Sequence, residues 1–153
     1  MKWIPILMAL LLLSGCAAQA QKEQSYRQIN MDEAIAMMES SRTGTTINPD
    51  TMAKQLTYTP SGSVYWPSHY ATVTSSSGYL SGIYARLKSG KPVLLGARNA
   101  YGKQHWVVVT GYTGGNSLTP ARFTIHDPGS YSRTTLQQFL SVYPTFYKYF
   151  YVR

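Results

Sequence analysis

The segment Gln104-His-Trp-Val-Val-Val-Thr-Gly-Tyr112 indicates the fold more directly than any other part of the chain. Its β-branched and aromatic residues favour a strand, and similar residues recur in Gly90-Lys-Pro-Val-Leu-Leu-Gly96 and Thr124-Ile-His-Asp-Pro128. Turn signals at residues 99–102, 114–116 and 127–129 mark the ends of these segments. We therefore expect strands over Pro92–Arg98, His105–Tyr112, Arg122–Asp127 and Tyr147–Val152.

Helical patterns are found mainly before these strands. Apolar residues at helical spacing predict a helix over residues 31–41, and Asn30 followed by Glu33 resembles a capping box at its start. Further helices are expected from Pro49, over residues 80–87 and over residues 135–140, whereas residues 57–78 are expected to form a long loop or short extended pieces. Helices followed by an antiparallel sheet predict an α+β domain, with the N-terminal helices packed on the C-terminal sheet.

The N-terminal segment has the organisation of a secretory signal. Lys2 precedes the apolar run from Ile4 to Leu13, which is too short to span a bilayer as a helix. The run ends in Leu13-Ser-Gly-Cys16, which contains the only cysteine of the chain. This pattern resembles the lipobox of bacterial lipoproteins, in which the cysteine becomes the lipid-bearing N-terminus. We expect a signal peptide over residues 1–15, a lipid-anchored tether over residues 16–25 and a domain over residues 26–153.

Composition limits the partners that this domain is expected to have. The formal net charge is +8, but the basic residues are scattered singly and no nucleic-acid-binding motif is present, so no nucleic-acid partner is predicted. The expected partners are a membrane, reached through the lipid, and a peptide or protein segment. Ala17 follows Cys16, which resembles the outer-membrane sorting pattern of enterobacterial lipoproteins. The expected location is therefore the bacterial cell envelope, at the outer membrane.

The three strand segments quoted above, in this order, resemble the second half of the papain-like cysteine peptidases that process bacteriocins at double-glycine leaders. In that family a strand opens with the catalytic histidine, and a later strand ends in an Asp-Pro pair whose aspartate orients the imidazole. The resemblance implies the papain-like peptidase fold, with His105 as the general base and Asp127 as its orienting carboxylate. It implies no cofactor. His69, His105 and His126 also lack the short spacing of metal ligands, so no metal site is expected.

The first half of the chain departs from the family pattern at the nucleophile. The family places its cysteine at the start of a helix, and the matching stretch here begins Asn30-Met31-Asp32-Glu33, with Met31 assigned to the cysteine position. A thioether does not ionise and is a poor nucleophile, and the two acidic residues oppose a thiolate. Gln24 or Gln28 is the candidate for the oxyanion-hole glutamine.

These observations favour a degenerate peptidase-like domain that binds a peptide or protein segment without cutting it. One alternative is an active hydrolase with a noncanonical nucleophile, for which Ser25, Ser40 and Ser41 are the candidates. Another is an envelope interaction or exclusion protein that uses the domain only as a surface.

The lipid attachment predicted at Cys16 is tested by metabolic labelling with a radioactive fatty acid. The wild-type chain should incorporate the label, and Cys16→Ser should not, because a hydroxyl does not take the place of the thioether-linked lipid. Label that persists in Cys16→Ser would exclude Cys16 as the attachment site.

Overall fold

The computed structural model describes residues 30–115 and 117–153. A helix that includes residues 30–43, here called the first helix, leads to α2 (Pro49–Gln55), a hairpin of β1 (Thr57–Tyr58) and β2 (Val64–Tyr65), and then β3 (Tyr70–Val73) and α3 (Tyr79–Lys88). The chain continues through β4 (Val93–Arg98), β5 (Gln104–Tyr112), the short helix η1 (Pro120–Arg122), β6 (Phe123–His126), α4 (Leu136–Val142) and β7 (Thr145–Val152). The predicted α+β fold is confirmed.

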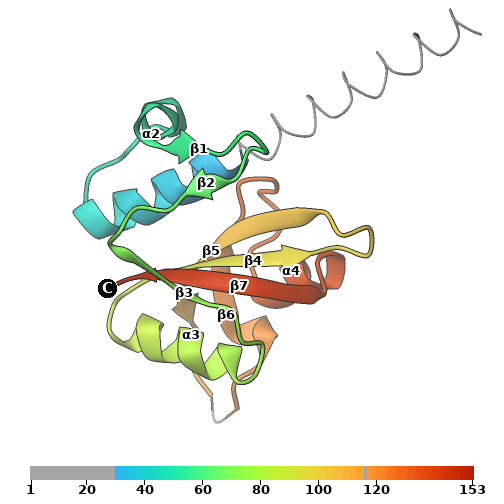
Figure 1. Ribbon diagram of the computed structural model, residues 1–153. Helices are drawn as coiled ribbons and strands as arrows, with labels where there is room; N and C mark the ends of the chain where they lie inside the picture. Colours follow the sequence, from blue (N-terminus) through green and yellow to red (C-terminus); the bar gives the residue numbers. More distant parts are fainter. Residues whose placement is uncertain (1–29, 116) are drawn as a thin grey trace, which may run out of the picture.

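A five-stranded antiparallel sheet organises the domain, in the order β3-β7-β4-β5-β6. The first helix lies on one face of this sheet, and α3 and α4 lie on the other (Figure 1). Residues 57–78, expected to form a loop or short extended pieces, contain the β1–β2 hairpin and the edge strand β3.

Strand β5, which lies between β4 and β6, is buried on both faces, which explains its nearly continuous apolar sequence. Trp106 and Val108 pack with the first helix, whereas Val107 and Val109 pack with α3 and α4. The adjacent strand β4 gives room to the large indole, since a Cβ at Gly96 would lie only 2.6 Å from the Trp106 ring. Burial of such side chains on both faces is the main favourable contribution to folding.

A buried carboxylate joins the first helix to the edge strand β3. Glu39 accepts hydrogen bonds from Tyr70 Oη at 2.6 Å and Arg42 Nε at 2.7 Å, and its Oε1 lies 2.9 Å from His69 Nε2. Burial alone would raise the pKa of this carboxyl, but the hydrogen bonds from Arg42, Tyr70 and His69 outweigh it, so the pKa is lowered. Ionised Glu39 therefore stabilises the contact between the helix and the sheet.

Removal of this charge should destabilise the domain in a pH-dependent way. Glu39→Gln should lower the free energy of unfolding at pH 7 by about 1–3 kcal/mol, because the buried hydroxyl of Tyr70 loses a charged acceptor. Since the pKa of folded Glu39 lies below that of an unfolded glutamate, its contribution is complete above about pH 4.3 and is lost as the pH falls through the folded value. Urea unfolding of both proteins at pH 7 and pH 3 should show a difference that shrinks at pH 3.

Glu33→Gln is the matched control, because Glu33 lies on the same helix and forms no ion pair with the described residues. It should not reduce stability at pH 7. An equal loss in both variants would mean that the Glu39 contacts contribute nothing specific.

Candidate functional site

His105 and Asp127 form a buried pair where β5 begins and β6 ends. The His105 Nε2 lies 2.6 Å from Asp127 Oδ1, and the two side chains are 1% and 0% exposed. β6 pairs with β5 only from Val108 onward, opposite His126, so the chain that leaves β6 brings Asp127 beside the start of β5. The expected contact between these residues is confirmed. Their catalytic roles remain a prediction.

Asp127 is fixed by several donors in addition to His105. Its Oδ1 accepts the Gly129 N–H at 2.8 Å, and its Oδ2 accepts Arg133 Nε at 2.6 Å. Burial raises the pKa of Asp127, but the hydrogen bond and charge of His105, followed by Gly129 and Arg133, outweigh it and lower the pKa below its ordinary value. The carboxylate is thus held ionised and in one orientation.

The imidazole of His105 is enclosed by its neighbours. The Tyr143 ring stacks on it with centroids 5.0 Å apart and an interplanar angle of 18°. On the side of the turn after β6, a Cβ at Gly129 would lie 2.7 Å from His105 Cε1, so this position requires glycine. Because Nε2 is engaged with Asp127, Nδ1 is the ring nitrogen left for a further contact. Nδ1 is buried and has no hydrogen-bond partner among the described residues.

Asn30, in the first helix, forms a hydrogen bond with β5, the strand that carries His105. Its Oδ1 accepts the backbone N–H of Trp106 at 3.2 Å, one residue from the histidine along β5. Asn30 is 6% exposed, and its Nδ2 has no hydrogen-bond partner among the described residues. Asn30 Nδ2 on the first helix and His105 Nδ1 on β5 are therefore two buried polar atoms without a hydrogen-bond partner among the described residues.

The nucleophile position expected at Met31 stays a prediction. Met31 is half-buried, packs against the apolar cluster of the first helix, β2 and β5, and lines the pocket described below. Its neighbour Asn30 makes the hydrogen bond to Trp106 and is a second candidate for that position. The sequence reasoning identified Asn30 only as a helix cap, because the Asn30–Glu33 pattern is also typical of a capping box.

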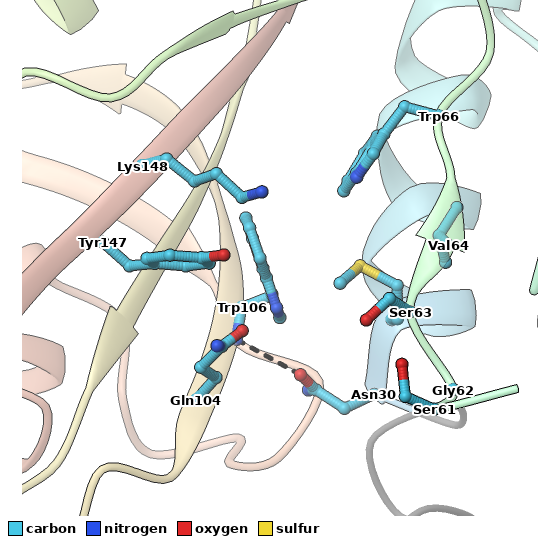
Figure 2. A pocket seen from close by; sticks show the side chains of 11 residues that line it. Asn30, Ser61, Gly62, Ser63, Val64, Trp66, Gln104, Trp106, Tyr147 and Lys148 are labelled. Atoms are coloured by element: carbon cyan, nitrogen blue, oxygen red, sulfur yellow. Dashed lines mark hydrogen bonds between the residues drawn. The ribbon is translucent and has the colours of Figure 1, made fainter. Parts of the chain in front are cut away.

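A pocket of about 120 Å³ opens beside Asn30, between the sheet and the β1–β2 hairpin. Figure 2 shows Gln104, Trp106, Tyr147 and Lys148 on the sheet side, facing Ser63, Val64 and Trp66 across the space. Gln104 and Trp106 share this face because they are two residues apart in a strand. Sequence reasoning did not select these lining residues. The alternation along β5 could have indicated Gln104, whereas Trp66 lies in a connection with no such signal.

A second hollow, of about 640 Å³, adjoins another face of the first helix and includes Asp127 and Ser41 in its lining. Ser40 is already engaged, because its hydroxyl donates to the Ala36 carbonyl at 2.6 Å and accepts the Ile47 N–H at 2.9 Å. Neither serine lines the pocket beside Asn30. Ser25, Gln24, Gln28 and Cys16 lie outside the described residues, as do the predicted signal peptide and tether.

The first turn of the first helix contains a carboxyl group, Asp32, whose surroundings disfavour its ionisation. Burial, followed by the charges of Glu33 and Asp50, raises the pKa of Asp32 to about 6. Its Oδ1 is buried and has no hydrogen-bond partner among the described residues. A thiolate near this carboxylate would be opposed electrostatically, in agreement with the effect expected from the sequence.

Residues 30–115 and 117–153 contain neither a cluster of metal ligands nor a helix that could span a membrane. No group of three or more His, Cys, Asp or Glu residues in these ranges is placed to hold a metal ion. Within the same ranges, no helix combines the length and apolar character needed to cross a membrane.

Comparison with known proteins gives one family match. No curated protein and no solved structure matches the chain. The model of the Peptidase_C39 like family matches residues 8–151, which is nearly the whole chain and includes His105, Asp127 and Asn30. The chain therefore belongs to the Peptidase_C39 like family.

Proposed function

We propose that this chain is a lipid-anchored protein of the bacterial cell envelope whose peptidase-like domain binds a peptide segment without cutting it. The observation that carries the proposal is the Asn30 carboxamide, which contacts the strand of His105 and lines the adjoining pocket. Peptidases of the resembled type need an ionisable thiol at this end of the helix. The only cysteine of the chain is Cys16, which is assigned to the lipid.

A carboxamide does not replace a thiolate in this reaction. Its nitrogen lone pair is delocalised into the carbonyl, so the group donates and accepts hydrogen bonds but is not among the nucleophiles that proteins use. His105 and Asp127 are placed as a base and its orienting carboxylate, yet a base requires a proton to remove from a nucleophile. The paired side chains then serve to shape the site.

The surroundings of Asn30 suit a peptide better than a purely apolar ligand. The pocket walls contain both aromatic rings, such as those of Trp66 and Trp106, and hydrogen-bonding groups, such as the amide of Gln104. Such walls offer apolar area for side chains and polar atoms for a backbone. The larger hollow beside Asp127 gives a further recess on the same helix. Binding of an extended segment between the helical part and the sheet follows by analogy with the family.

The proposed lipid anchor determines where in the cell this binding would occur. An acylated Cys16 would hold the domain at a membrane through more than one acyl chain, which suffices for stable attachment. Ala17 favours the outer membrane. The bound segment would then belong to a peptide or protein of the envelope.

The proposal is tested by incubating the full chain in detergent with a defined mixture of synthetic peptides, followed by mass spectrometry of retained and free peptides. We expect retention of a subset of peptides and no new peptide ends. Ser63 is exposed and lines the pocket. Ser63→Trp should therefore reduce this retention severalfold, because the added indole would fill part of the pocket.

Ser81→Trp is the matched control, since Ser81 is exposed on α3, on the opposite face of the sheet. It should retain peptides as the wild type does. Equal retention by Ser63→Trp would remove the pocket from the proposal. New peptide ends that disappear in His105→Ala would instead establish the alternative of an active hydrolase.

A further inference from the structure

We propose that the pocket beside Asn30 selects ligands that carry a carboxylate next to an apolar side chain, with Lys148 as the residue that recognises the charge. This inference rests on the proposed function and adds the chemistry of the segment that is bound. The argument starts from the polar atoms that line the pocket.

The polar lining of the pocket is rich in donors. Lys148 contributes an ammonium, and Asn30 contributes the Nδ2 donor that has no partner among the described residues although the residue is 6% exposed. No aspartate or glutamate is found among the described residues that line this pocket, and no described carboxylate forms an ion pair with Lys148. A buried donor and an unpaired cation at the two ends of one pocket favour a ligand that brings negative acceptor oxygens.

A β-bulge places Lys148 and its neighbour Tyr147 in the same pocket. On β7, Lys148 pairs with Gly96 and Phe146 pairs with Ala97, so Tyr147 is an extra residue opposite β4. In a regular strand these two adjacent side chains would point to opposite faces. The bulge redirects one of them, so that both line the pocket (Figure 2). This local irregularity brings an ammonium and a phenol to one site.

Aromatic rings surround the amine of Lys148. The Lys148 Nζ lies 4.7 Å from the Tyr147 ring centroid and 5.1 Å from that of Phe150. Aromatic faces attract a cation. Gly96, which pairs with both Lys148 and Trp106, has no side chain to separate the ammonium from the indole. Figure 2 shows the Lys148 amine beside Trp106, directed toward Trp66 across the space.

The apolar part of the pocket sets the size of the accompanying group. Trp66 stacks on Phe150 at 3.5 Å between centroids and lies 5.9 Å from Trp106, so the two indoles form an apolar corner. The volume of about 120 Å³ is close to that of an engineered cavity, about 150 Å³, that accommodates benzene. One apolar side chain with an adjacent carboxylate therefore matches the pocket. Both a peptide C-terminus and an internal acidic residue supply this chemistry.

The test measures binding of three short probes to the full chain in detergent by isothermal titration calorimetry. The probes are N-acetyl-Ala-Leu with a free carboxylate, the same dipeptide as its C-terminal amide, and N-acetyl-Asp-Leu amide. We expect a carboxylate-bearing probe to bind about tenfold more tightly than the neutral amide, as for one charge-assisted hydrogen bond. The preferred acidic probe distinguishes a C-terminal from an internal carboxylate.

Lys148→Met should abolish this preference, because methionine keeps much of the apolar stem but carries no charge, so the acidic probes should lose their tighter binding relative to the neutral amide. Lys148→Arg should restore the preference, since a guanidinium also binds carboxylates. Lys54→Met, which removes an exposed cation on α2 outside the pocket, should behave as the wild type. Thermal unfolding of each variant establishes that the domain remains folded.

Equal affinity of the wild type for the acidic and neutral probes would overturn the inference, and so would a preference that survives in Lys148→Met. Absence of binding by every probe would also overturn it. In each case the retention of longer peptides tests the proposed function separately, because that assay does not require a carboxylate. If the wild-type chain binds the acidic probes selectively but retains no longer peptides, the proposed function is contradicted and this inference is not.

Discussion

The hydrogen bond from the Trp106 N–H to the Asn30 carboxamide connects the two halves of the domain at the point where the site is formed. Trp106 belongs to β5, whose alternate side chains enter the clusters on both faces of the sheet. A change in the position of the first helix would therefore move the wall of the pocket relative to His105. Farther along the same helix, the hydrogen bond from Tyr70 to Glu39 connects it to β3.

The histidine–aspartate pair was expected from the resemblance to the peptidase family, and its geometry is local to adjacent strands. His105 opens a strand of unmistakable β character, and Asp127 closes a strand that pairs with it. Antiparallel pairing alone brings such positions close together. The helix residue that contacts β5 near the pair was harder to predict, because a difference of one position turns a helical side chain by about 100°. Asn30 has the same signature as a cap, and Met31 fits an apolar helix face equally well.

The pocket depends on features that leave little trace in sequence. Trp66 is placed by a connection between short strands, and Lys148 by an irregular register on β7. A regular strand would send Tyr147 and Lys148 to opposite faces, so the pattern of β7 gives no reason to group them. Tertiary packing determines both positions. The sheet and the buried pair were accessible to sequence reasoning, whereas the charge selectivity of the pocket required the structure.

The central proposal is that residue 30 holds the nucleophile position of the family, and that asparagine there removes the reaction. Iodoacetamide alkylation of Asn30→Cys, in a Cys16→Ser full chain at neutral pH, tests it most directly. A thiol near an imidazole at this site should react faster than a free cysteine, and His105→Ala should remove most of the enhancement. Asp32 limits the size of the effect. Met31→Cys, with and without His105→Ala, should react at the same rate in both backgrounds. The account is contradicted if the rate of Asn30→Cys does not depend on His105, or if only that of Met31→Cys does.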